Sequence, residues 1–152
     1  MPHELHHAGY LISDDPMRIS VDAVHAYLSR SYWAAGIPRE IVARALQNSL
    51  CLGIYDSQSE QVGLVRAVSD YATFAYLCDV YVLEAHRRRG LAKAAVGLLM
   101  THPRLQGLRR MQLVTHYAQP LYAQFGFVPV EIPQRHMEKR DSTVYRGPMG
   151  NR

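Results

Sequence analysis

The sequence predicts an α/β sandwich, in which a mixed sheet is packed against helices. Two apolar, strand-like runs, 50–55 and 61–68, flank a short polar turn and predict a hairpin. A long apolar run over 71–83 predicts a third strand, and a helical pattern follows over 91–101. The chain then alternates strand, short helix and strand between residues 111 and 130. Strands and helices that alternate in this order pack as layers around one core.

The N-terminal part of the chain is expected to supply one strand and two helices. Residues 1–8 are predicted to be a loose leader, and 9–13 a strand. Ser20 can cap a helix over 21–29, because its hydroxyl accepts from one of the first free N–H groups. Pro38 fits the first turn of a second helix, where its missing N–H costs nothing.

The C-terminal part is expected to return to the sheet. Pro120 begins a short helix, and Gly126 is suited to the left-handed position that ends it. A strand is predicted over 127–130, and one more around Val144-Tyr145.

Length and composition predict one globular domain over residues 1–152. The chain is 48% hydrophobic and 20% charged, which is ordinary for a folded protein. We expect no membrane span, because no apolar run approaches the ~20 residues that a bilayer requires. Cys51 and Cys78 lie in apolar runs and are expected to be reduced, buried thiols of a cytoplasmic protein. The formal net charge of +4 suits an anionic ligand.

The most informative segment joins the long strand to the 91–101 helix. It is a basic glycine turn with the sequence Arg87-Arg88-Arg89-Gly90-Leu91-Ala92-Lys93. The first N–H groups of a helix lack internal partners, and the helix dipole places positive charge there, so a diphosphate can bind. A solvated basic turn and a nucleic-acid patch are the alternatives. We favour the diphosphate because of the strand-to-helix position, and no recognised nucleic-acid module accompanies the charge.

At these residues the chain resembles the GNAT acetyltransferase superfamily. The pyrophosphate signature of that superfamily, Arg/Gln-x-x-Gly-x-Gly/Ala, corresponds to Arg87-Arg88-Arg89-Gly90-Leu91-Ala92. Its Tyr-x-x-x-Gly-Phe element corresponds to Tyr122-Ala123-Gln124-Phe125-Gly126-Phe127. The similarity covers about residues 50 to 130. It implies a mixed, mostly antiparallel central sheet flanked by helices.

The resemblance implies acetyl-CoA as cosubstrate and no metal. Val80, Tyr81 and Val82 would offer backbone groups to the pantetheine arm, and a backbone N–H near Val82 would polarise the thioester carbonyl. Tyr122 would protonate the departing thiolate as general acid, although its ring is also a candidate core residue. The diphosphate would be held by Arg87, Arg88, Arg89, Gly90, Leu91, Ala92 and Lys93.

The chain departs from the superfamily pattern at two places. The segment 115–120 lacks the Asn that many relatives carry there for CoA. Tyr76 and Gln112 stand where some relatives place a glutamate base. Asp79 is the candidate base, but it has the opposite strand parity to Tyr76 and faces the cleft only if a bulge intervenes. Deprotonation through a water chain is the alternative.

Four further residues are candidates for contact with the acceptor. Trp33 lies between the two N-terminal helices and either walls the acceptor pocket or packs one helix on the other. Arg66 and Asp70 would bind a carboxylate or an amine, or form a surface ion pair. His116 ends a strand and is either a substrate contact or a structural histidine. The zinc-like pattern His-Glu-x-x-His at residues 3–7 lacks a helical flank and is assigned to the leader.

Together these features predict an acetyl-CoA-dependent N-acetyltransferase that acts directly on a primary amine. We expect the amine to belong to a small molecule or amino acid. Neither cysteine stands at a recognisable nucleophile position. A protein lysine or N-terminal acetyltransferase, and an acyl-CoA-binding sensor without turnover, are the alternatives. No nucleic-acid or membrane partner is expected. Dimers are common in the superfamily that the chain resembles, which makes the tail from Pro133 onward a candidate contact for a homodimer.

Overall fold

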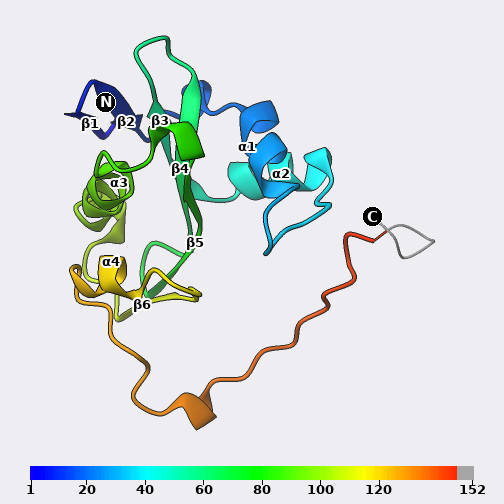
Figure 1. Ribbon diagram of the computed structural model, residues 1–152. Helices are drawn as coiled ribbons and strands as arrows, with labels where there is room; N and C mark the ends of the chain where they lie inside the picture. The colour runs from blue at the N-terminus through cyan, green and yellow to red at the C-terminus, as the bar shows by residue number, and fades with distance from the viewer. Residues whose placement is uncertain (147–152) are drawn as a thin grey trace.

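A computed structural model describes residues 1–146 and shows a six-stranded sheet with the order β1-β2-β3-β4-β5-β6 (Figure 1). The strands are β1 (Glu4–His7), β2 (Tyr10–Ser13), β3 (Leu50–Tyr55), β4 (Gln61–Ser69), β5 (Phe74–Val82) and β6 (Arg110–Leu113). The helices are α1 (Val21–Leu28), α2 (Arg39–Gln47), α3 (Leu91–Met100) and α4 (Gln119–Ala123). Each strand pairs antiparallel with the next except β6, which joins β5 in parallel. The mixed, mostly antiparallel sheet with helices on its faces is therefore confirmed.

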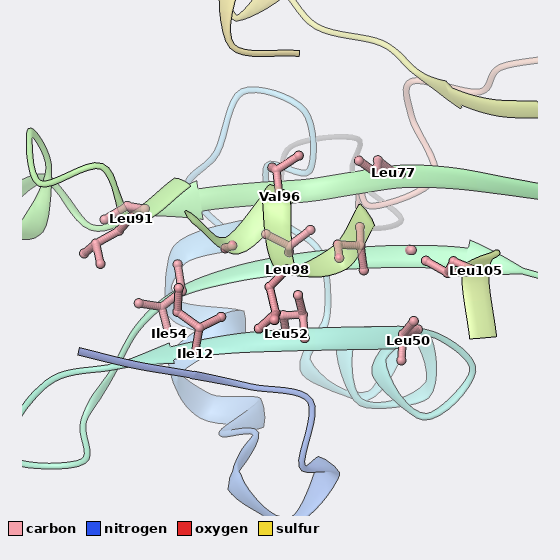
Figure 2. Close-up of a cluster of buried hydrophobic side chains, with 14 of the residues drawn as sticks. Ile12, Leu50, Leu52, Ile54, Leu77, Leu91, Val96, Leu98 and Leu105 are labelled. Carbon is pink, nitrogen blue, oxygen red and sulfur yellow. The ribbon is translucent and has the colours of Figure 1, made fainter. Parts of the chain in front are cut away.

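The alternation of side chains along the strands divides the core into two layers. On one face, Leu52 and Ile54 of β3 pack with Leu91, Val96 and further apolar residues of α3 (Figure 2). On the other face, α1 and α2 bury a second cluster. Its fully or nearly fully buried members include Val24, Val42, Leu64 and Tyr81. Helices thus cover both faces of the sheet, and the strand ends between them are available for a site.

The prediction that residues 1–8 form a loose leader is wrong. Residues Glu4–His7 form β1, which pairs with β2 across a two-residue turn in which Ala8 and Gly9 have φ of 51° and 83°. Such turns match the twist of a hairpin, and glycine is favoured there. All four β1 residues are exposed or half-buried, so the strand carries no hydrophobic alternation to predict it.

The histidines of the first seven residues brace β1 against α3. His3 Nε2 lies 3.2 Å from the Leu98 carbonyl oxygen and 3.2 Å from Thr101 Oγ1. His7 Nε2 lies 2.9 Å from the Arg89 carbonyl oxygen. The zinc-like pattern is therefore on a strand, and its histidines make structural contacts.

The strands expected over 127–130 and at Val144-Tyr145 are absent from the described part of the chain. Phe127 stays with α4, since its N–H donates to the Tyr122 carbonyl. Pro129 removes one backbone donor, and the chain then leaves the body of the protein (Figure 1). The predicted elements before this point are confirmed within a few residues, including the Ser20 cap, whose hydroxyl accepts from Ala23 N at 3.0 Å.

Within residues 1–146, no helix combines the length and the apolar character that crossing a membrane requires.

Candidate functional site

The basic turn between β5 and α3 contains two residues with left-handed backbone conformation. Arg88 has φ of 65° and Gly90 has φ of 73°, and Gly90 is the N-cap of α3. No side chain caps this helix, so the N–H groups of its first turn are available to a ligand. The Lys93 ammonium and the arginines add positive charge to the helix dipole. This arrangement fits an anion such as a diphosphate.

A cavity of about 340 Å³ extends from this turn along β5 to α4. It brings Tyr122, the predicted general acid, together with nearly all the residues predicted to hold the cofactor: Val80, Tyr81, Val82, Arg87, Arg88, Gly90, Leu91, Ala92 and Lys93. Arg89 is not among its lining residues, and its carbonyl is held by His7. Arg87 lines the cavity, but its Nε also donates to the Val82 carbonyl at 2.8 Å, so this arginine secures the end of β5.

The strands β5 and β6 separate beside this cavity. Their pairing runs from Phe74 with Arg110 to Leu77 with Leu113, and β5 then continues alone on that side as far as Val82. An extended chain can bind to a strand edge of this kind by main-chain hydrogen bonds. The edge therefore fits the pantetheine arm that the resemblance implies.

Tyr122 presents its phenol to the same cavity from α4. The ring is buried, with 7% of the residue exposed, and meets Phe127 edge to face at 5.9 Å. Its hydroxyl has no hydrogen-bond partner in the described part of the chain, and it is not a fully buried atom. Burial raises the pKa of this phenol, so it remains protonated at neutral pH. Tyr122 thus both packs in the core and lines the cavity.

A second cavity of about 210 Å³ lies between the sheet and helices α1 and α2. Its lining is mostly apolar, with Arg66, Cys78 and Asp79 on the sheet side. Trp33 lines this cavity and also the cavity beside the basic turn, so the two adjoin. Trp33 was predicted either to wall an acceptor pocket or to pack one helix on the other, and it lies where the two cavities meet.

A bulge in β5 turns Asp79 toward the second cavity. The β4–β5 register shifts between Leu64 and Arg66, and Asp79 has φ of 51°. Because of this bulge, the neighbouring residues Cys78 and Asp79 both line the cavity. The sequence predicted that Asp79 would face the cleft only if a bulge interrupted its strand, and this bulge is present.

The Asp79 carboxylate is the centre of a buried polar network. Arg66 Nε lies 2.6 Å from Oδ2, and Trp33 Nε1 donates to Oδ1 at 2.8 Å. The exposed fractions of the Arg66 and Asp79 side chains are 17% and 8%. Arg66 also donates to Ser49 Oγ at 3.0 Å. Arg66 therefore belongs to the second cavity, in a buried ion pair in place of the surface pair with Asp70 considered above.

Asp70 and His116 line neither cavity. Asp70 holds the β4–β5 turn, where its carboxylate accepts from the N–H groups of Ala72 and Thr73 and from the Thr73 hydroxyl. These bonds lower its pKa, and its expected contact with the acceptor is corrected to a turn-stabilising role. His116 is exposed and packs on Tyr32, with ring centroids 4.6 Å apart.

Both cysteines are free. Burial raises the pKa of the Cys78 thiol to about 11 and that of Cys51 to about 12. Cys78 therefore lines the second cavity as a neutral thiol at physiological pH, which disfavours it as a nucleophile.

Sequence reasoning missed three residues that shape the site. Tyr27 of α1 stacks on Tyr81, with ring centroids 3.9 Å apart and an angle of 5°. Helical spacing could have found it, because it follows Val24 by three residues. His7 supports the turn from β1, and Tyr145 lines the second cavity. Neither has a local sequence signal.

Comparisons with known proteins agree with this architecture. A model of the Acetyltransferase (GNAT) family matches residues 17–127. A Gibberella zeae protein named "Putative acetyltransferase FG08082" is 38% identical over 128 residues, which are 70% of this chain and 71% of that protein.

Solved structures extend the similarity to the fold. A crystal structure from Xanthomonas campestris pv. campestris, described as a "putative acetyltransferase belonging to the gnat family", is 43% identical with a TM-score of 0.88. The match covers 92% of this chain and 99% of that one. Glucosamine-6-phosphate N-acetyltransferase from Arabidopsis thaliana shares the fold, with a TM-score of 0.60 and 16% identity. That match covers 86% of this chain and 97% of the other. The chain belongs to the GNAT acetyltransferase family.

Proposed function

We propose that this protein transfers the acetyl group of acetyl-CoA directly to a primary amine of a small molecule. One observation carries this proposal: two cavities adjoin at Trp33, one with the features of a CoA site and the other with a buried carboxylate. A direct transfer needs both substrates bound at once, and neighbouring cavities permit that.

The chain holds acetyl-CoA through backbone groups and charge. The first N–H groups of α3, with Arg88 and Lys93 nearby, bind the diphosphate, and the free edge of β5 pairs with the pantetheine arm. Acetyl-CoA supplies an activated acyl group with a thiolate as leaving group.

The acceptor amine binds in the second cavity, beside Asp79. The Arg66 and Trp33 bonds use one lone pair on each Asp79 oxygen, so each oxygen keeps acceptor capacity for an amine N–H. Both oxygens of the Asp79 carboxylate are already held, by the Arg66 guanidinium at 2.6 Å and by the Trp33 indole at 2.8 Å. We therefore assign Asp79 to positioning the amine and assign removal of the proton to water. The size of the cavity, about 210 Å³, favours a small molecule over a protein side chain on a folded surface.

Tyr122 supplies the proton that the leaving thiolate needs. Its phenol lines the cofactor cavity, and burial raises its pKa, so the proton remains available at alkaline pH. The nucleophilic amine must be neutral, so turnover should increase with pH through the titration of the amine.

Thiol release from acetyl-CoA, measured with a panel of primary amines, tests the proposal. We expect release with at least one amine and a much slower reaction for Tyr122→Phe, which keeps the ring that packs on Phe127. Calorimetric binding of acetyl-CoA without release for any amine would favour the sensor alternative. Release with lysine peptides and with none of the small amines would favour the protein acetyltransferase.

A further inference from the structure

The two sides of the second cavity differ in chemistry. The sheet side carries Arg66, Cys78 and Asp79. The opposite side is formed by α1, α2 and the loop that joins them, which lie on one face of the sheet (Figure 1). No charged side chain of these helices lines the cavity in the described part of the chain. The aliphatic residues on this side include Leu28, Ala34, Ile37, Ile41, Val42 and Ala45.

The charges on the sheet side cancel each other. Arg66 Nε donates to Asp79 Oδ2 at 2.6 Å, and Arg66 Nη1 donates to Ser49 Oγ at 3.0 Å. Burial raises the pKa of the Cys78 thiol to about 11, so this group is neutral at physiological pH. Among the described residues, Arg66 and Asp79 are the only charged side chains that line the cavity. The cavity therefore offers a substrate no net charge.

A carboxylate on the acceptor finds no suitable partner in such a cavity. A carboxylate that leaves water needs a cation and several hydrogen-bond donors. Arg66 is the one cation of the described lining, and it is already paired with Asp79. An α-amino acid would carry its carboxylate two bonds from the reacting amine, where the negative charge of Asp79 repels it. The cavity is therefore unsuited to an acidic acceptor.

Hydroxyl groups on the acceptor find few partners either. Trp33 Nε1 is already bonded to Asp79 Oδ1. Apart from this indole and the ion pair, the described lining has only two polar side chains, the Cys78 thiol and the Tyr145 phenol. A hydroxyl that is buried without a hydrogen bond loses the bonds it made to water. An amino sugar carries more hydroxyl groups than these two side chains can satisfy.

We propose that the acceptor is a primary amine on an uncharged, apolar carbon skeleton, either a short alkyl chain or a single hydrocarbon ring. This inference rests on the proposed acetyl transfer and names the class of its acceptor. The amine donates to Asp79, and the skeleton packs on the aliphatic side chains of α1 and α2. The cavity volume of about 210 Å³ equals the liquid volume of about seven water molecules, which suits a skeleton of this size.

The chemistry of the transfer is the same for any acceptor of this class. The amine nitrogen forms a bond to the acetyl carbonyl carbon, and the carbon–sulfur bond breaks with its electron pair on sulfur. The thiolate takes a proton from Tyr122. The amine gives a proton to water, and Tyr122 is reprotonated from water.

Pairs of amines that differ by one carboxylate test the proposal on the full chain. Phenylethylamine is compared with phenylalanine, and pentylamine with norleucine, with each rate divided by the fraction of neutral amine at the assay pH. We expect kcat/KM to be at least ~100-fold higher for the amine without the carboxylate. Phenylalaninamide has the same branch without the charge and should react faster than phenylalanine. Glucosamine should react more slowly than pentylamine.

Two variants of α2 test whether the apolar wall holds the skeleton. Ile41→Asn places an amide in the wall and should lower kcat/KM for phenylethylamine at least ~10-fold without changing acetyl-CoA affinity. Ala45→Leu keeps the wall apolar but fills space, so it should lower kcat/KM for phenylethylamine more than for ethylamine. Arg44→Asn is the control, because Arg44 is exposed on the same helix and does not line the cavity. It should behave as the wild type.

Calorimetry with the CoA-saturated protein separates this inference from the proposed acetyl transfer. Binding of phenylethylamine and not of phenylalanine, without thiol release from acetyl-CoA, would support the acceptor class and contradict the transfer. Release with phenylalanine or glucosamine as fast as with phenylethylamine would overturn the acceptor class and leave the transfer intact. If both α2 variants keep the wild-type preference, the skeleton does not lie on this wall and the inference is wrong. Neither binding nor release with any amine would overturn both.

Discussion

Substitution of Gly90 by Asp should abolish tight binding of acetyl-CoA without unfolding the protein. Gly90 has φ of 73°, and a side chain in this conformation costs ~1–2 kcal/mol. The added Cβ would lie 3.3 Å from His7 Nε2, the end of a side chain that can move by a few tenths of an ångström. The fold should therefore tolerate the change. The new carboxylate would stand at the N-cap of α3, where the diphosphate is expected.

The size of the effect follows from Coulomb's law. A carboxylate ~5 Å from a phosphate charge is repelled by about 1 kcal/mol in water and about 3 kcal/mol near a protein surface. With two phosphate charges nearby, we expect acetyl-CoA affinity to fall at least ~30-fold in isothermal titration calorimetry.

Gly107→Asp is the matched control, because Gly107 has φ of 74° and an added Cβ would meet nothing within 4 Å. This variant introduces the same backbone strain and the same negative charge, but Gly107 does not line the cavity beside the basic turn. Urea unfolding should show similar losses of stability for the two variants, and only Gly90→Asp should lose affinity. A folded Gly90→Asp variant that binds acetyl-CoA within threefold of the wild type would refute the diphosphate site.

Four further outcomes are expected. Tyr122→Phe should lower kcat ~100-fold or more with little change in acetyl-CoA affinity. Because burial raises the pKa of the Tyr122 phenol, kcat of the wild type should decline with pH only above the usual tyrosine range. The variant should lack that decline. Arg66→Met should lower the free energy of unfolding by ~3–5 kcal/mol, because it leaves the buried Asp79 carboxylate without its ion-pair partner. Adding Asp79→Asn should restore part of the lost stability. A loss below ~1 kcal/mol in Arg66→Met alone would contradict the buried ion pair. Tyr55→Phe should raise the free energy of unfolding by about 1 kcal/mol in urea titrations, because the buried Tyr55 hydroxyl has no partner in the described residues, and a clear loss would show a missed bond. Alkylation of Cys78 by iodoacetamide should be slow at pH 8 and accelerate up to about pH 11, and rapid labelling at pH 7 would disprove its protonated state.

The cavity beside the basic turn, where we propose that acetyl-CoA binds, was predictable because its signals are local. A glycine that must adopt positive φ, the unpaired N–H groups of a helix start and a basic turn are all encoded within seven residues, 87–93. The preceding strand fixes the place of this turn, so the predicted lining from Val80 to Lys93 is nearly the observed one.

The second cavity, where we propose that the acceptor binds, was only partly predictable, because it depends on a bulge and on packing between distant elements. From the alternation of side chains along a regular strand, Asp79 is expected to point away from the cleft. The bulge in β5 changes the direction of its side chain, so that it lines the second cavity. The partner of Arg66 was also beyond local reasoning: Asp70 is close in sequence, but the antiparallel pairing of β4 with β5 places Arg66 opposite Cys78, beside Asp79.

By itself, the sequence determined the order of the elements between residues 9 and 123 and the basic glycine turn before α3, since hydrophobic period, caps and glycine act over a few residues. Tertiary structure alone decided that β1 forms, that Asp79 faces the second cavity, and that residues 128–146 leave the sheet. The physical reason is that strand pairing, bulges and chain exit are settled by contacts between residues far apart in the sequence, where no short-range preference dominates.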